Sequence, residues 1–435
     1  MKYSDYFKDK KVTVMGLGLL GRGVGDTEFL AQAGADLIVT DLKTKEELKE
    51  SVARLEKYPN ITFVLGEHRL EDFKDRDMIL KAAGIPLYSP YIEEAKKNNI
   101  PIEMSASLFT KLSGVPVIGV TGTRGKSTVT HMLYEILKAA GKDVLLGGNV
   151  KGIATLPLLN DVRGKSIALF ELDSWQLQGF GESKISPHIA IFTTFFEDHM
   201  NYYKSDPEQY LRDKANIFQY QNGNDVLVLG SQCAKFIQEK YPNIKSKTIV
   251  PNLYDISYKL GVPGEHNRYN AGLVEVGAKE LDIDEETIRK VLSEFKGVPG
   301  RLELVCNISG VKYYNDTTST TPISTLAGLK ALRGEGGIIL IMGGADKELD
   351  MSELIKELPS YTKHVILLDG TGTEKVKDKI THELVAKSME EAVLKAQSLA
   401  KEGNVVLMSP AFASFGMFKN EFDRGDQFTE AVYDL

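Results

Sequence analysis

The sequence predicts an α/β protein whose domains are built around mostly parallel sheets. Short β-branched runs alternate with helix-like segments along the whole chain. Glycine-rich loops follow two of the strand-like runs, and the pattern restarts after each of two breaks. The first break lies near Ser105, and the second is Gly297–Gly300, where Pro299 between glycines has the composition of a hinge. We therefore expect three domains, over residues 1–104, 105–299 and 300–435.

The elements follow in order. In the first domain we expect strands at Lys11–Met15 and Asp36–Thr40 and helices at Val24–Ala33 and Lys43–Tyr58. In the second we expect strands at Val115–Val120, Ser166–Leu172, Ile189–Thr193 and Asp225–Leu229, and helices at Ser127–Ala140 and Asn267–Leu281. In the third we expect strands at Leu302–Asn307, Ile338–Met342, Val365–Leu368 and Val405–Met408.

The composition excludes several classes of protein. The 435 residues include 53 basic and 60 acidic side chains, a net charge of −7, which argues against a uniformly basic nucleic-acid binder. The two cysteines share no metal-binding spacing and are expected as reduced thiols. No apolar run approaches the roughly 18–20 residues of a membrane span, and the first residues do not form a signal peptide. We expect a monomeric cytoplasmic protein without nucleic-acid or membrane partners.

The first glycine loop is Gly16-Leu17-Gly18-Leu19-Leu20-Gly21, between a strand and a helix. Asp41 closes the next strand, 20 residues after Gly21. Such loops let the backbone approach a diphosphate at a helix N-terminus, which predicts a Rossmann-like domain. NAD or FAD, another nucleotide diphosphate, and a purely structural turn all remain open at this point.

The second loop is Thr121-Gly122-Thr123-Arg124-Gly125-Lys126-Ser127-Thr128. It departs from the strict P-loop pattern because the first glycine would fall on Val120. Its functional half is intact: two glycines free backbone N–H groups, Lys126 reaches terminal phosphates, and the Ser127 hydroxyl ligates Mg²⁺. The central domain is therefore expected to be of the P-loop ATPase type.

The octet T-G-T-R-G-K-S-T resembles the ATP loop of the Mur ligase superfamily, which includes the peptidoglycan amide ligases and the folylpolyglutamate synthases. Further segments resemble superfamily motifs in the same order along nearly the whole chain. They are Gly147–Asn149, Glu171–Leu177, Glu197–His199 with Tyr210 and Lys214, Gly264–Asn270, Pro299–Arg301, Asn315-Asp316 and Ser409–Gly425. The last block and the N-terminal nucleotide fold are most similar to the glutamate-adding member.

The resemblance implies a reaction. ATP would phosphorylate the carboxylate of UDP-N-acetylmuramoyl-L-alanine, and the amine of glutamate, expected as D-glutamate, would capture the acyl phosphate in peptidoglycan precursor synthesis. It also implies two Mg²⁺ sites. Ser127 and Glu171 would hold one ion, His199 and a carbamylated Lys214 the other, and Lys126, His199 and Lys214 would be catalytic.

The resemblance implies binding roles as well. ATP would contact Gly122, Thr123, Gly125, Lys126, Ser127, Thr128, Asn267, Asn270, Arg301 and Asp316. The UDP substrate would contact Gly18, Leu19, Leu20, Asp41, Lys43 and Asn149 through the N-terminal Rossmann-like domain. The incoming amino acid would contact Thr320, Lys347 and Ser414 in a C-terminal domain that is also Rossmann-like.

The sequence departs from the superfamily pattern in four places. Asp173 replaces a serine, Thr194-Phe195-Phe196 replaces N-[IV]-[ST], Thr318 replaces a lysine, and Glu421 replaces a phenylalanine. These departures leave the added amino acid and its configuration open. The alternatives are addition of L-glutamate, a folylpolyglutamate synthase, an NAD-dependent oxidoreductase built on the first loop, and a non-catalytic nucleotide sensor.

Overall fold

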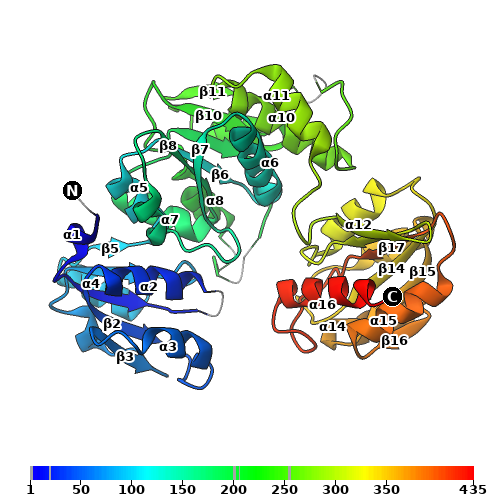
Figure 1. The fold of residues 1–435 in the computed structure, drawn as a ribbon, viewed down its shortest axis with the longest axis horizontal. Coiled ribbons are helices and arrows are strands. Elements are labelled where there is room, and N and C mark those ends of the chain that lie inside the picture. Colours follow the sequence, from blue (N-terminus) through cyan, green and yellow to red (C-terminus); the bar gives the residue numbers. More distant parts are fainter. Residues whose placement is uncertain (1–2, 19–20, 199–201, 205, 253–255) are drawn as a thin grey trace. The chain divides into compact units, whose positions relative to one another are not determined.

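The computed structural model describes residues 3–18, 21–198, 202–204, 206–252 and 256–435 (Figure 1). The chain divides into two compact units. The first contains Met1–Ile256 and Asn270–Val291, and the second contains Ser257–Tyr269 and Leu292–Leu435. Two sheets belong to the first unit and one to the second, and nearly all strand pairs are parallel. The predicted α/β class is confirmed.

The N-terminal sheet has the order β3-β2-β1-β4-β5, and all its strands are parallel. Its elements are α1 Tyr3–Phe7, β1 Lys11–Met15, α2 Arg22–Gln32, β2 Asp36–Asp41, α3 Lys49–Leu55, β3 Ile61–Leu65, η1 Leu70–Phe73, β4 Met78–Lys81, α4 Pro90–Lys97 and β5 Ile102–Glu103. The strand order reverses between β1 and β4, so a ligand crevice is expected at the carboxyl ends of these strands. The charged helix predicted from Lys43 begins only at Lys49.

The central sheet has the order β11-β10-β9-β6-β8-β7 and is also parallel. Its strands are β6 Val117–Thr121, β7 Asp143–Gly148, β8 Ser166–Glu171, β9 Ile189–Phe192, β10 Val226–Leu229 and β11 Lys247–Ile249. The helices of this region are α5 Ser105–Ser113, α6 Lys126–Ala139, η2 Leu156–Asp161, α7 Ser174–Ser183, α8 Pro207–Ala215, α9 Ser231–Lys240, α10 Glu265–Lys279 and α11 Glu285–Glu294. Because β6 lies between β8 and β9, the segments after these three strands meet at one sheet edge.

Helix α2 attaches the N-terminal sheet to the central one. The Asp26 carboxylate is buried and accepts hydrogen bonds from Ser105 Oγ at 2.5 Å and from the backbone N–H of Leu156 at 2.8 Å. At Gly25 the two parts approach so closely that a Cβ would lie 2.6 Å from the Cβ of Ala154. One apolar cluster runs through both parts and includes Phe7 and Phe170. The two sheets therefore form a single packed unit.

The C-terminal sheet has the order β12-β13-β17-β14-β15-β16, in which only β12 is antiparallel to its neighbour. Its elements are β12 Glu303–Ile308, β13 Val311–Asn315, α12 Pro322–Ala331, β14 Ile338–Gly343, α13 Ser352–Glu357, η4 Leu358–Ser360, β15 Thr362–Leu368, α14 Thr371–Val376, η5 Lys377–Lys379, β16 Leu384–Ala386, α15 Met389–Leu399, β17 Val405–Met408 and α16 Glu421–Tyr433. Apolar clusters line its two faces, which helices cover on both sides (Figure 1).

Within the described ranges, no helix combines the length and the apolar character needed to cross a membrane.

Candidate active site

The phosphate loop joins β6 to α6. Gly125, with φ +88°, precedes the first turn of α6, and Ser127 and Thr128 lie in that turn. At this φ another residue would be strained, and a Cβ on Gly125 would also lie 2.5 Å from Oδ1 of Asn270, so the position favours glycine. The geometry is that of a helix N-terminus that presents backbone N–H groups to an anion.

The segment Thr194-Phe195-Phe196, one of the departures, holds this loop in place. The carbonyl of Thr194 accepts a hydrogen bond from the N–H of Thr123 at 2.7 Å. The Oγ1 of Thr194 accepts another from the N–H of Arg124 at 2.9 Å. Thr123 Oγ1 donates to the Phe196 carbonyl and accepts from the Phe196 N–H, each at 3.0 Å. Phe195 stacks on Tyr210 with ring centroids 5.5 Å apart. The departure therefore supports the loop rather than disrupting it.

Two lysines converge on one carbonyl of the loop. Lys126 Nζ donates to the carbonyls of Gly122 and Thr123, each at 3.2 Å. Lys214, on α8, is 1% exposed, and its Nζ donates to the same Gly122 oxygen at 2.8 Å. Burial, reinforced by the charge of Lys126, holds the pKa of Lys214 well below its ordinary value. A neutral amine at this position is a nucleophile.

The carboxylate predicted to bind metal lies on the neighbouring strand. Glu171 ends β8 and is buried, and its strand partner Val120 directly precedes Thr121 at the end of β6. One carboxylate oxygen accepts from Asn149 Nδ2 at 3.2 Å. The described residues contain no group of three or more His, Cys, Asp or Glu side chains that could hold a metal ion. A carboxylate and a hydroxyl fit Mg²⁺ nonetheless, since this ion is usually held by one or two carboxylates together with substrate phosphates.

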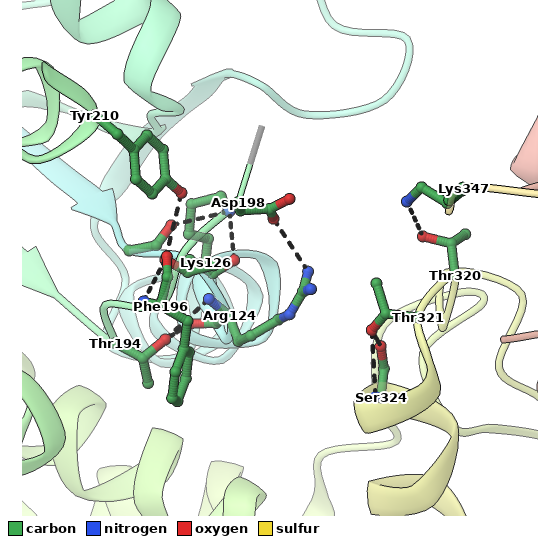
Figure 2. A network of polar contacts seen from close by, with 12 residues as sticks. Arg124, Lys126, Thr194, Phe196, Asp198, Tyr210, Thr320, Thr321, Ser324 and Lys347 are labelled. Carbon is green, nitrogen blue, oxygen red and sulfur yellow. Dashed lines mark hydrogen bonds and ion pairs between the residues drawn. The ribbon is translucent and has the colours of Figure 1, made fainter. Parts of the chain in front are cut away.

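Some predicted site residues lie outside this description. His199, Leu19 and Leu20 are not among the described residues, so their roles stay predictions. Arg124 and Asp198, which precedes His199, form an ion pair at 3.5 Å (Figure 2).

The two asparagines predicted to contact ATP, Asn267 and Asn270, are both buried on α10. Asn270 lies against Gly125, as described above. The Asn267 side chain donates to the carbonyl of Pro263 at 2.6 Å. Asn270 therefore lies beside the phosphate loop, and the ATP role of Asn267 stays a prediction.

In the N-terminal sheet, Asp41 organises the first glycine loop. One oxygen accepts from the backbone N–H groups of Leu17 and Gly18, at 2.9 and 3.2 Å, and the other accepts from Lys43 N–H at 2.9 Å. The resemblance implied a direct contact of Asp41 with the UDP substrate. In this structure the carboxylate shapes the loop that would receive the nucleotide.

Arg22 is a polar residue that sequence reasoning missed. Its Nη1 donates to Asn149 Oδ1 at 2.6 Å, so a side chain of the N-terminal sheet reaches a predicted substrate residue beside Glu171. A single arginine at a helix start carries no recognisable spacing, and only the three-dimensional arrangement reveals this contact.

Asp173, another departure, caps a helix. It precedes α7, and its Oδ1 accepts from the N–H of Gln176 at 2.7 Å while Gln176 Oε1 accepts from Asp173 N–H at 3.2 Å. This reciprocal pair is a capping box, a role that serine also fills.

In the C-terminal unit, Asp316 is buried and bonded within its own sheet. Its carboxylate accepts from Leu302 N–H, Ser319 Oγ and Ser409 Oγ at 3.0, 2.6 and 2.8 Å, and burial raises its pKa to about 6. Arg301 donates its backbone N–H to Val298 at 2.9 Å. The ATP roles of Asp316 and Arg301 remain predictions.

Of the residues predicted to bind the incoming amino acid, Thr320 precedes α12 and Ser414 lies in the loop before α16. Lys347 Nζ donates to Thr320 Oγ1 at 3.3 Å (Figure 2), while Ser414 is buried. At the remaining departures, Thr318 bonds the Gly300 carbonyl through its hydroxyl at 3.1 Å, and the Glu421 carbonyl accepts from Thr317 Oγ1 at 2.6 Å. Glu421 therefore contributes a structural contact through its backbone, which its side chain does not determine.

Comparison with protein families gives three matches in chain order. The Mur ligase MurD-like N-terminal domain matches residues 10–103, the Mur ligase middle domain matches residues 120–255, and the Mur ligase glutamate ligase domain matches residues 300–412.

Curated relatives match over the full length. Three are named UDP-N-acetylmuramoylalanine–D-glutamate ligase. The protein of Borreliella burgdorferi strain ZS7 is 36% identical, with 99% of each chain covered. That of Streptococcus pneumoniae strain CGSP14 is 36% identical over 100% of both chains. That of Roseiflexus sp. strain RS-1 is 33% identical, covering 97% of this chain and 98% of the relative.

Solved structures agree in fold. UDP-N-acetylmuramate-alanine ligase MurC from Thermotoga maritima has a TM-score of 0.63 at 18% identity, covering 98% of this chain and 99% of that one. MurF ligase from the same organism, in complex with ADP, has a TM-score of 0.60 at 18% identity, covering 100% and 97%.

Proposed function

The chain belongs to the Mur ligase family, and on that premise we propose that it joins D-glutamate to UDP-N-acetylmuramoyl-L-alanine with hydrolysis of ATP to ADP and phosphate. Full-length similarity to ligases named for this reaction supports the proposal. The observation that carries it is the phosphate loop, on which Lys126 and the buried Lys214 converge. Because the chain belongs to this family, we no longer interpret the first glycine loop as the cofactor site of an oxidoreductase.

The phosphate loop would bind and orient ATP. Backbone N–H groups at the start of α6, together with Lys126, would neutralise the charge that develops as the γ-phosphate moves to the substrate carboxylate. Asn270, whose side chain lies beside Gly125, would contact the bound nucleotide. Holding phosphate and carboxylate in line, together with this charge neutralisation, would supply most of the catalysis expected for such a transfer.

Mg²⁺, when bound, would screen the charge of the phosphate oxygens, and Ser127, Glu171, His199 and Lys214 would hold it in two sites. An ammonium at Lys214 would repel the ion, whereas a carbamate formed with CO₂ would bind it. The depressed pKa of Lys214 favours the neutral amine that CO₂ requires.

The remaining sheets would bind the other substrates. The glycine loop that Asp41 organises would receive the UDP group, and Thr320, Lys347 and Ser414 would bind the glutamate. We further propose that the enzyme acts as a monomer in the cytoplasm, where nucleotide-linked cell-wall precursors are made.

Substrate omission tests the proposal. ADP release is expected only when ATP, UDP-N-acetylmuramoyl-L-alanine and D-glutamate are all present. ADP release without the UDP substrate would indicate an ATPase, and its absence with all three substrates would refute the proposed function.

A further inference from the structure

Arg22 connects two sites that belong to different sheets. It is the first residue of α2, immediately after the glycine loop that would bind the substrate diphosphate. Its Nη1 donates to Asn149 Oδ1 at 2.6 Å and approaches the carbonyl oxygen of Gly148 at 3.4 Å. Both hydrogen bonds that the described structure gives Arg22 come from Nη1, which leaves the Nε and Nη2 donors for a ligand.

The contact fixes the orientation of the Asn149 amide. A guanidinium only donates hydrogen bonds, so the amide atom that faces Arg22 must be the oxygen. The amide nitrogen therefore faces Glu171 Oε1, 3.2 Å away, and an ionised carboxylate only accepts. The order of donors and acceptors in Arg22, Asn149 and Glu171 allows one amide orientation.

The position of Arg22 is itself well defined. Asp26 lies one turn later on α2 and bonds Ser105 and Leu156 of the central part, and Gly25 lies against Ala154. Helix α2 is thus held on the segment that begins at Gly148, and Arg22 reaches Asn149 from a fixed base.

We propose that Arg22 is a positioning residue that binds the substrate diphosphate and, through Asn149, orients the Glu171 carboxylate toward the magnesium site. This inference rests on the proposed function, because the diphosphate is that of its substrate. Filling the UDP site would then favour the arrangement of Glu171 needed for phosphoryl transfer, although the two sites lie on different sheets.

Calorimetry with UDP and UMP, without Mg²⁺, tests the diphosphate contact. Arg22→Gln should weaken UDP binding about tenfold, the effect of losing one charge-assisted hydrogen bond to phosphate, and leave UMP binding unchanged. Arg22→Lys should recover part of the UDP affinity. Arg54→Gln is the matched control, because Arg54 bonds Glu28 of the same helix on the exposed surface, and it should bind UDP as the wild type does.

A magnesium titration of ADP release tests the connection to Glu171. Arg22→Gln and Asn149→Ala should each raise the Mg²⁺ concentration for half-maximal rate several-fold. The double variant should need no more Mg²⁺ than Asn149→Ala alone, since Arg22 acts through Asn149.

Two results would overturn the inference: equal loss of UDP and UMP affinity in Arg22→Gln, or additive magnesium effects in the double variant. Unchanged UDP affinity in Arg22→Gln would overturn it as well. Calorimetry does not depend on turnover, so a wild-type protein that releases no ADP would refute the proposed function while the comparison of UDP with UMP still decides the role of Arg22.

Discussion

The buried Nζ of Lys214 donates a hydrogen bond to the carbonyl oxygen of Gly122, 2.8 Å away, in the loop that would hold the phosphates of ATP. The contact brings α8 to the phosphate loop and places a second nitrogen beside that of Lys126. Carbamylation of Lys214 would attach an anionic carboxylate to this nitrogen and leave it one N–H. The reactive nitrogen of Lys214 therefore lies in direct contact with the loop that would bind ATP.

Replacing Lys214 tests this link. Lys214→Met should reduce the rate of ADP release by about 10²-fold or more, because the site would lose the proposed carbamate ligand of Mg²⁺. In ¹³C-bicarbonate the wild-type protein should show a carbamate signal by NMR that the variant lacks. Lys235→Met, at a side chain that is 91% exposed on α9, should keep both the activity and the signal. A variant with wild-type turnover would exclude a catalytic role for Lys214.

Lys126 is expected to act mainly in the transition state. Lys126→Ala should lower kcat by about 10²–10³-fold, as removal of a preorganised charge-stabilising donor does. The exposed Lys142, just beyond α6, provides the control substitution Lys142→Ala. Steady-state ADP release measures both, and near-normal kcat in Lys126→Ala would contradict the role given to the loop.

Asp26 predicts a pH dependence of stability. Burial raises its pKa from 3.8 to about 6, so the folded protein holds this proton more tightly than the unfolded chain does. The free energy of unfolding contributed by Asp26 should therefore increase as the pH falls from about 6 toward 4, and ionisation above pH 6 should weaken the attachment of α2. Urea unfolding of the wild type and of Asp26→Asn, between about pH 4.5 and 7.5, gives the free energy of unfolding of each protein and isolates the effect of Asp26. A difference between them that does not change with pH would refute it.

The capping role of Asp173 predicts that this departure from the family pattern changes neither activity nor stability. Asp173→Ser should keep activity and stability near wild type, because serine also caps a helix that carries glutamine at the third position. Asp173→Ala should lose about 1 kcal/mol of unfolding free energy. Thermal unfolding and ADP release distinguish these outcomes, and a large loss of activity in the serine variant would show that the carboxylate has a further role.

Much of the fold follows from local pattern. Apolar runs before glycine loops predicted β1, β6 and their helices, since a buried parallel strand is continuously hydrophobic. Strand β13 was missed, although Ser309-Gly310 between two strand-like runs is a hairpin signal that predicts its pairing with β12. Helix α3 was predicted too long because its charged sequence has the composition of a helix along its whole length.

The site could be predicted only in part. The phosphate-loop pattern indicated Lys126, the resemblance to superfamily motifs indicated Glu171 and Lys214, and the structure brings Lys126 and Lys214 to one carbonyl. The roles of Asp41 in shaping its loop and of Arg22 in reaching Asn149 depend on contacts between distant segments, which no local pattern encodes. The spacing of Asp173 and Gln176 is that of a capping box, so this role of Asp173 could also have been predicted from the sequence.

The most direct measurement is the rate of ADP release with ATP, Mg²⁺ and UDP-N-acetylmuramoyl-L-alanine against a panel of D- and L-amino acids. D-glutamate should support turnover, and the product should be the substrate extended by one glutamyl residue in the mass spectrum. L-glutamate and the other amino acids should give no more than background release. If no isomer of glutamate supports turnover, the proposed reaction is wrong, and turnover with a different amino acid would assign the enzyme to another step.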